Sequence, residues 1–319
     1  MRDMFLSLAS SAYALVDWTP RLTVLTLHRV HPTAEIRPRH VERCFRYLAS
    51  RFHVTRPSEL DAATHHRRVA LVTIDDGHVD AYRHIFPIAR ASGVPIALCV
   101  PTDFFLRGAW LWFDKIAWAK QQARAGTRIR VDGVDLLAGD PTGFESLVVR
   151  LKRDPPPRRD EVIAEMFARL AVAPPPSPPD EYRSLTADEM KEMLRSGLVE
   201  LVGHTASHTI ATVLPDADLR RELKESKAEL EAFSGRPLAA FCYPNGGRGD
   251  FSPATSAAVR EMGYALAFTS IEGTNHLRRA EPFTLRRVHV HPRQAVVEKL
   301  CSGLGDVQNR IAGRVVGDA

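Results

Sequence analysis

Short apolar segments and longer amphipathic segments alternate along most of the chain. Residues 22–30 alternate apolar and polar positions as a strand does, and apolar side chains in residues 40–52 recur at helical spacing. Residues 69–74 then form an apolar, β-branched run that is typical of a buried strand. A strand, a helix and a second strand in this order predict a βαβ unit with parallel strands.

The same alternation resumes in the second half of the chain. A capping box formed by Thr186 and Glu189 opens a predicted helix that ends at Gly197. The pattern further predicts helices at 79–92, 218–233 and 252–262, and strands at 95–100, 199–203, 238–243, 264–269 and 285–290. The polar motifs described below fall where strands end, as in open and barrel-shaped α/β folds.

The pattern changes between about residues 102 and 182. Proline clusters at 155–157 and 174–179 bracket a predicted helix at 159–170, and proline runs favour extended linkers. An apolar stretch before them either forms a core or offers a wall for sugar stacking, and its aromatic residues are Trp110, Trp112, Phe113 and Trp118. We interpret this region as an insertion on the core domain and expect it to act as a mobile lid.

Composition and charge limit the function classes. The 319 residues are enough for one large α/β domain or two smaller ones. The net charge of +5 comes from scattered Lys and Arg residues, so we do not predict nucleic-acid binding. The chain has no run of about 18 apolar residues, so no membrane span is expected. The four cysteines form no Cys-x-x-Cys pair and therefore indicate neither a zinc knuckle nor a redox motif.

The N-terminal segment is moderately apolar at residues 5–16. Serine residues dilute the apolar part and almost no positive charge precedes it, which fits a secretory signal less well than a short amphipathic helix. Such a helix would pack on the protein body or make a peripheral contact with a membrane surface. We keep packing on the body and contact with a membrane as alternatives for this helix.

The predicted strand at 69–74 ends in Asp75, Asp76 and Gly77. Neighbouring side chains on a regular strand point to opposite faces, but a glycine turn at the strand end lets both carboxylates line one pocket. Two ionised carboxylates this close repel each other unless a cation is present. The motif therefore predicts a cation site, although a surface Asp-Asp-Gly turn would have the same sequence.

A second polar motif follows the predicted strand at 199–203. His204 and His208 are spaced i, i+4 and would face the same way if the segment opened a helix. With one carboxylate they make three ligands, which leaves an open position for water as in catalytic zinc sites. The expected cofactor is a divalent metal: zinc suits two histidines and an aspartate, and cobalt or nickel are alternatives.

Three segments resemble motifs of the polysaccharide deacetylases, carbohydrate esterase family 4, also called the NodB-homology family. Residues 73–77 resemble the family's Thr-Phe-Asp-Asp-Gly motif, and residues 204–208 are similar to its metal-binding histidine motif. Residues 241–246 resemble the loop that supplies the oxyanion contact, and the corresponding residues here are Tyr243, Pro244 and Asn245.

The resemblance runs from about residue 22 to residue 291, without the insertion. It implies an α/β fold with a distorted (β/α) barrel, and metal-dependent removal of N- or O-acetyl groups from glycans. In the family motif the first aspartate is the general base and the second is a metal ligand. By this resemblance Asp75 is the base, and the metal ligands are Asp76, His204 and His208.

One departure from the family concerns the partner of the base. Many members carry Arg-x-Pro-Tyr where this chain has residues 242–245, and the arginine steadies the base carboxylate. Asp75 therefore needs another partner, for which Arg286 and Arg287 on the last predicted strand are the candidates.

A second departure concerns the general acid. Members usually place it on a late histidine, for which His289 and His291 are candidates. Residues 25–30 instead resemble the early Tyr-His motif of the exopolysaccharide, or poly-N-acetylglucosamine, branch, in which the acid comes from the first strand. We therefore assign the acid to His28 and keep the two late histidines as alternatives.

The predicted function is removal of N-acetyl groups from N-acetylhexosamine units of a surface polysaccharide or its precursor, in exopolysaccharide biosynthesis. An O-acetyl esterase or a deformylase is an alternative, and a non-catalytic glycan-binding relative is a weaker one. The predicted layout is a helical segment at 1–21, a catalytic domain at 22–300 with the insertion at about 102–182, and a tail at 301–319. We expect a cytoplasmic location, with the periplasm as the alternative, and the sequence leaves the oligomeric state open.

Overall fold

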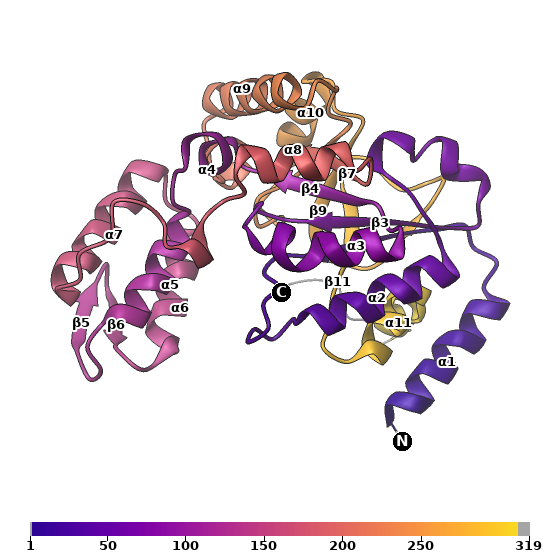
Figure 1. Ribbon diagram of the computed structural model, residues 1–319, viewed down its shortest axis with the longest axis horizontal. Coiled ribbons are helices and arrows are strands. Elements are labelled where there is room, and N and C mark those ends of the chain that lie inside the picture. The colour runs from indigo at the N-terminus through magenta and orange to yellow at the C-terminus, as the bar shows by residue number, and fades with distance from the viewer. Residues whose placement is uncertain (1, 312–319) are drawn as a thin grey trace.

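A closed barrel of parallel strands forms the centre of the computed structural model, which describes residues 2–311 (Figure 1). Its seven strands are β1 (Arg21–Leu27), β3 (Arg68–Ile74), β4 (Ile96–Val100), β7 (Val199–Gly203), β8 (Ala240–Cys242), β9 (Leu266–Glu272) and β11 (Leu285–His289). Their order is β1-β11-β9-β8-β7-β4-β3, and the ring closes because β3 pairs with β1 along its whole length. The predicted α/β fold with a distorted (β/α) barrel is confirmed.

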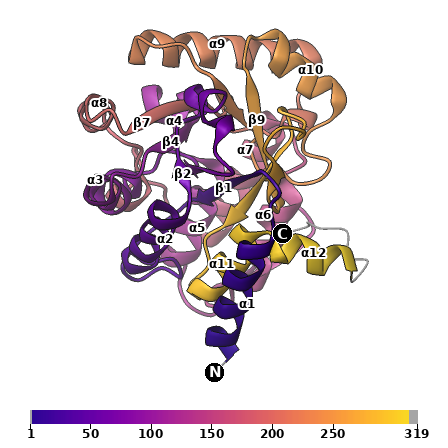
Figure 2. The ribbon, with the colours of Figure 1, turned by 90° about the vertical axis from the view of Figure 1, so that its right-hand side faces the viewer.

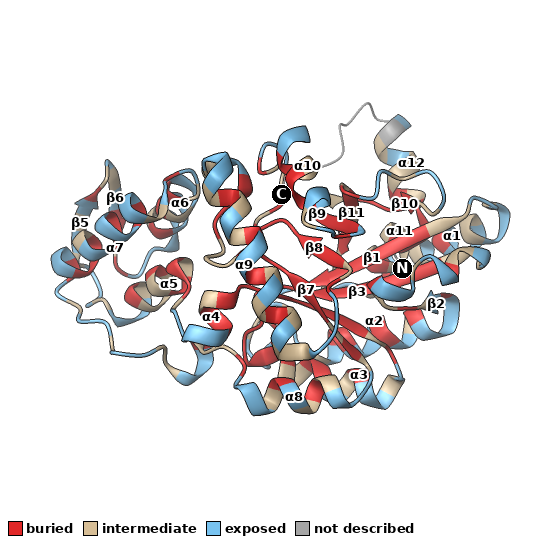
Figure 3. Ribbon diagram, turned by 90° about the horizontal axis from the view of Figure 1, so that it is seen from above, coloured by how far each residue is buried: buried red, intermediate tan, exposed pale blue. Residues whose placement is uncertain are grey.

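Helices surround the barrel and expose their outer faces (Figures 2 and 3). They are α2 (Pro38–Arg51), α3 (Phe86–Ser92), α8 (Ala187–Arg195), α9 (Asp216–Ser234) and α10 (Pro253–Glu261). The capping box of α8 forms as predicted, because the Thr186 hydroxyl accepts from the Glu189 N–H and the Glu189 carboxylate accepts from the Thr186 N–H. The helix predicted at 79–92 is less regular, since a wide π-helical turn at Ala81–Ile85 precedes α3.

Alternate residues of each barrel strand face the interior and the surrounding helices. In β3, Val69 and Leu71 belong to the core inside the barrel, whereas Ala70 and Val72 pack against the helices. This alternation is the two-residue period of a strand. It explains the nearly continuous apolar runs in the sequence, because strands covered on both faces have no solvent-facing positions.

The insertion forms a separate lobe beside the barrel (Figure 1). After α4 (Thr102–Arg107) it consists of α5 (Trp112–Gln122), the hairpin of β5 (Arg128–Val131) and β6 (Val134–Leu137), α6 (Pro141–Leu151) and α7 (Pro156–Leu170). A core of its own holds these elements together, with residues such as Trp112, Leu147 and Met166. The sequence predicted α7 and the aromatic stretch of α5, but neither the hairpin nor α6.

The first and last described helices lie on the outside of the barrel (Figure 2). Helix α1 (Arg2–Val16) lies beside α11 (Gln294–Ser302), and the Ser7 hydroxyl donates to Glu298 at 2.5 Å (Figures 1 and 2). Several apolar side chains of α1, such as Phe5 and Leu15, are exposed. Within residues 2–311 no helix combines the length and apolar character needed to cross a bilayer. Residue 1 and residues 312–319 of the predicted end segments lie outside the described residues.

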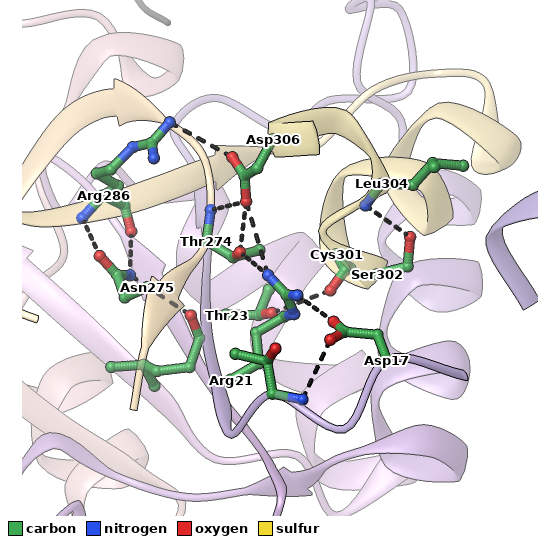
Figure 4. Close-up of polar contacts among 12 residues, drawn as sticks. Asp17, Arg21, Thr23, Thr274, Asn275, Arg286, Cys301, Ser302, Leu304 and Asp306 are labelled. Atoms are coloured by element: carbon green, nitrogen blue, oxygen red, sulfur yellow. Dashed lines mark hydrogen bonds and ion pairs between the residues drawn. The ribbon is translucent and has the colours of Figure 1, made fainter. Parts of the chain in front are cut away.

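A polar network covers the amino ends of β1 and β11, opposite the rim that carries the polar motifs (Figure 4). Asp306 of α12 (Leu304–Ile311) accepts from the N–H of Thr274 at 3.1 Å and pairs with Arg286 at 3.4 Å. Arg21 pairs with Asp17 and bonds the Thr274 hydroxyl at 2.5 Å. Short edge strands complete the sheet here, with β10 (Asn275–His276) beside β1 and β2 (His53–Val54) beside β3.

Candidate active site

The carboxyl ends of the barrel strands bring polar side chains to one rim. His28 follows β1, Asp75 follows β3 and His204 follows β7, while Arg287 and His289 belong to β11. All five positions continue the inward-facing alternation of their strands. The strand period alone therefore directs residues that are far apart in the chain into the same end of the barrel.

Asp76 reaches this site by a turn of the backbone. It would point out of the barrel if β3 continued, because Ile74, two residues earlier, packs against the outer helices. Asp76 and Gly77 instead adopt left-handed conformations, with φ of 71° and 77°. Aspartate tolerates this region better than most residues, and glycine does so without a steric penalty. Both carboxylates therefore line one cavity, as predicted for the motif.

Asp76, His204 and His208 converge on one point. Oδ1 of Asp76 lies 3.0 Å from Nε2 of His208 and 3.6 Å from Nε2 of His204, and these donor atoms all lie within 4.8 Å of one another. The two histidines do not lie on a helix, which was the condition under which their i, i+4 spacing would make them face the same way. The segment is a loop in which Thr205 and His208 have φ of 59° and 57°, and these left-handed residues bring the imidazoles together.

This donor set fits a divalent cation. Nδ1 of His204 lies 2.7 Å from the carbonyl oxygen of Cys242, which directs the Nε2 lone pair of the ring toward Asp76. Burial by itself raises the pKa of Asp76, but its contacts with the two imidazoles hold that pKa well below the ordinary range, so the carboxylate is ionised. Two imidazole nitrogens and a carboxylate oxygen are ligands of zinc and of neighbouring transition metals.

Asp75 has different surroundings from its neighbour. One carboxylate oxygen accepts from Nη1 of Arg287 at 2.8 Å, and the other lies 3.2 Å from Nε2 of His28. Burial raises the pKa of Asp75, but the charges of Arg287 and His28 outweigh it and lower the pKa below its ordinary value. Asp75 is therefore an ionised carboxylate whose charged contacts, Arg287 and His28, are not among the proposed cation ligands.

Arg287, one of the two arginines considered from the sequence, is the partner of Asp75. Its side chain is 1% exposed, and it also donates to the Thr269 carbonyl at 2.6 Å and to the Ser270 hydroxyl at 3.2 Å. Arg286 instead bonds the carbonyl of Glu272 and pairs with Asp306 at 3.4 Å, as part of the polar network outside this site (Figure 4). The alternation of β11 separates the two arginines. Arg287 lies two residues after Leu285, which faces the inside of the barrel, so Arg287 shares that face and Arg286 does not.

The three histidines considered for the general acid differ in position. His28 contacts Asp75 and its side chain is 47% exposed, so it can reach a substrate. The ring of His289 stacks on that of His28 at a centroid distance of 6.5 Å. Burial, and then the Arg287 charge, lower the pKa of His289, which disfavours its protonated form. Nδ1 of His291 accepts from the Arg293 N–H at 3.0 Å.

The loop after β8 carries the residues predicted for the oxyanion contact. The Tyr243 N–H donates to the Phe268 carbonyl at 3.0 Å, and the Tyr243 ring lies in the outer core. Pro244 has no N–H. Asn245 has a left-handed φ of 62° and lines the cavity, and within residues 2–311 its N–H has no hydrogen-bond partner. Of the three, the structure places only Asn245 at the cavity.

A comparison with protein families now adds to this geometry. A family model described as polysaccharide deacetylase matches residues 165–267. The matched stretch contains both histidines of the candidate cation site and the loop with Asn245, and the barrel places the Asp75–Asp76 turn beside them. The resemblance to the polysaccharide deacetylases is confirmed.

Solved structures share the fold of this polysaccharide deacetylase-like chain. The deacetylase PplD from Streptococcus pyogenes, in complex with acetate, gives a TM-score of 0.60 at 15% identity, over 89% of this chain and 99% of that one. IcaB from Ammonifex degensii gives a TM-score of 0.55 at 20% identity, over 89% of this chain and 97% of IcaB. The BpsB deacetylase domain from Bordetella bronchiseptica gives a TM-score of 0.53 at 20% identity, over 85% of this chain and 96% of that domain. Among curated proteins none matches the sequence.

The insertion completes the cavity of the deacetylase-like barrel. The cavity has a volume of about 240 Å³, and the insertion contributes Trp112, Phe113, Val148, Lys152 and Arg159 to its lining. The Phe113 ring contacts His208 at a centroid distance of 5.3 Å. The aromatic stretch was visible in the sequence, whereas the two cations have no sequence signal that separates them from other Lys and Arg residues. The lid movement remains a prediction.

A buried polar contact ties the insertion to the aspartate motif. Nε2 of His78 lies 2.7 Å from Asp114 of α5, and Nδ1 of His78 lies 3.9 Å from Asp76. Arg29, which follows His28, bonds Asp80 at 2.7 Å and lies 3.9 Å from Asp114. Sequence reasoning missed His78, although its position directly after the Asp-Asp-Gly motif is a usable signal.

Proposed function

We propose that the protein is a metal-dependent hydrolase that removes N-acetyl groups from N-acetylhexosamine units of a surface polysaccharide or its precursor. The observation that carries this proposal is the different environment of two adjacent carboxylates. Asp76 lies with two imidazoles in a set that fits a cation, whereas Asp75 lies between Arg287 and His28. These surroundings support a role as metal ligand for Asp76 and as ionised base for Asp75, the two roles that metal-dependent hydrolysis of an amide needs side by side.

The residues of the chain have separate tasks in this proposal. A divalent cation held by Asp76, His204 and His208 would polarise the acetyl carbonyl and lower the pKa of a water molecule. Asp75 accepts a proton from the water molecule while the water oxygen attacks the carbonyl carbon. The Asn245 N–H donates to the oxyanion that develops. His28 then donates a proton to the nitrogen as the C–N bond breaks, which yields acetate and a free amine.

Metal removal tests the proposed function. Treatment with a chelator should reduce acetate release from N-acetylglucosamine oligomers to background, and added zinc should restore it, because Asp76 and the histidines need a cation to act. His204→Ala should lower the metal content measured by mass spectrometry, and zinc should not restore its activity. Full activity of the metal-free protein would overturn the proposal. A panel of O-acetyl and N-formyl substrates separates the esterase and deformylase alternatives.

The role of His28 can be tested by changing the leaving group. His28→Gln should slow release of acetate from N-acetyl substrates by about 10²–10⁴-fold, because the amine must be protonated as it leaves. Hydrolysis of 4-nitrophenyl acetate should fall much less, because nitrophenolate leaves without a proton. Steady-state rates on the two substrates, at equal metal content, give the comparison.

His289→Gln and His291→Gln are the matched controls for His28. We expect each to change both rates by similar, small factors, because neither ring contacts Asp75. If one of them showed the leaving-group dependence and His28→Gln did not, the acid would be that histidine instead.

A further inference from the structure

We propose that Arg159 and Lys152 of the insertion bind an anionic group, a carboxylate or a phosphate, that the glycan substrate carries next to the acetylated sugar. The proposal rests on the deacetylase function proposed above and deepens it by naming the charge of the substrate. It starts from a cation that is buried beside the catalytic cavity without a counterion.

Arg159 belongs to α7 and lines the cavity together with His208. It is only 5% exposed, and its guanidinium lies over the Trp112 ring at 4.9 Å from the centroid. Within residues 2–311 no carboxylate lies within salt-bridge distance of it, and its buried Nε atom has no hydrogen-bond partner. Arginine stays protonated in proteins, so this is a buried positive charge with open donors.

Neighbouring carboxylates do not supply the missing partner. Asp154 pairs with Arg150 at 2.8 Å, and Glu222 accepts from the N–H groups of Ala206 and Ser207 at 3.2 Å each. Asp160 is exposed. A buried charge is normally paired, because its loss of hydration is otherwise uncompensated. The open partner position of Arg159 therefore points to an anion that arrives with the substrate.

Lys152 of α6 adds a second cation to the same cavity. Its Nζ atom donates to the Asn245 Oδ1 at 2.5 Å, which holds the ammonium at the cavity wall. Asn245 and His208 belong to the rim of the barrel, so both cations of the insertion face the barrel side of the site. A planar guanidinium matches a carboxylate or phosphate through two parallel hydrogen bonds, and a neutral hydroxyl cannot compensate its charge.

The kinetic test compares three matched N-acetylated oligosaccharides. One carries a uronic acid next to the N-acetylhexosamine, one carries a phosphorylated hexose there, and one carries the neutral hexose. Arg159→Met keeps the aliphatic packing on Trp112 and removes the charge. We expect it to lower kcat/KM about 10- to 100-fold on the preferred anionic substrate, mainly through KM, and to lower kcat/KM on the neutral substrate by a clearly smaller factor. Whichever of the two anionic substrates has the higher kcat/KM identifies the anionic group as a carboxylate or a phosphate.

Two further variants on the insertion are controls. Arg169→Met removes an exposed arginine of the same helix, which pairs with Glu165 at 2.7 Å, and should change none of the three rates. Arg159→Lys keeps the charge without the planar fork and should give an intermediate loss. An equal loss on all three substrates in Arg159→Met would overturn the proposal, since Arg159 would then act in the chemistry or the fold. A wild-type preference for the neutral substrate would also overturn it.

A binding measurement separates this proposal from the deacetylase function. Calorimetric titration of the metal-loaded protein uses methyl glucuronide, methyl glucoside 6-phosphate and methyl glucoside, none of which carries an acetyl group. Binding of one anionic glycoside that weakens at least about tenfold in Arg159→Met, without binding of the neutral one, would support the anion site even if no acetate were ever released. Equal affinity of all three for the wild type would overturn the anion site and leave the hydrolase proposal standing.

Discussion

Replacing Asp75 with asparagine should reduce acetate release by about 10²–10⁴-fold while the protein keeps its metal. Asparagine has nearly the same shape as aspartate but cannot accept a proton from water at neutral pH. The proposed cation ligands are Asp76, His204 and His208, whose donor atoms lie within 4.8 Å of one another, and Asp75 is not among them. The variant therefore separates proton transfer from metal binding.

The measurement is kcat on an N-acetylglucosamine oligomer together with the metal content of the same sample. Asp76→Asn is the matched control, because it makes the same chemical change at the next residue but removes a proposed ligand. We expect Asp76→Asn to lose metal as well as activity, and Asp75→Asn to lose activity alone. An Asp75→Asn variant with wild-type turnover would contradict the base assignment, and one that loses its metal would show that Asp75 is itself a ligand.

The sequence predicted where the barrel strands end because strand geometry follows directly from its pattern, whereas the separate roles of Asp75 and Asp76 came from the resemblance to the family motif. The apolar runs of β1, β3, β7 and β11 define where each strand ends, and the two-residue period directs the side chains that follow. The inward positions of His28, Asp75 and His204 follow from that period. The same rule separates Arg287 from Arg286 once the structure shows that Leu285 faces the inside of the barrel, whereas the sequence left both arginines as candidates.

Loop geometry and the insertion could not be predicted in the same way. The meeting of His204 and His208 depends on left-handed residues in the loop, and the i, i+4 spacing suggested a helix instead. The positions of Lys152 and Arg159 at the cavity depend on how a second, independent core docks beside the barrel. Such docking arises from tertiary contacts between segments and leaves no periodic signal in the chain.

Replacing Arg287 with methionine should destabilise the protein by about 3–5 kcal/mol at neutral pH, because it leaves the buried Asp75 charge without its main partner. The ion pair is almost fully buried, with side chains 1% and 2% exposed, so solvent does not screen it. The free energy of unfolding in urea, with chelator present in all samples, gives the comparison without a contribution from metal binding. Arg46→Met is the control, since it breaks an exposed pair with Glu42 and should change stability by no more than about 0.5 kcal/mol.

The pH dependence of this difference identifies Asp75 as its source. In the wild type the pKa of folded Asp75 lies below its unfolded value of about 3.9, so its contribution is complete above that pH and is lost as pH falls through the folded pKa. Without Arg287, burial raises the pKa of the folded carboxyl, so the variant gains relative stability as pH falls. The difference between the two proteins should therefore shrink from pH 7 to pH 4. A difference that stayed constant over this range would place the loss in the bonds of Arg287 to Thr269 and Ser270 and not in its charge on Asp75.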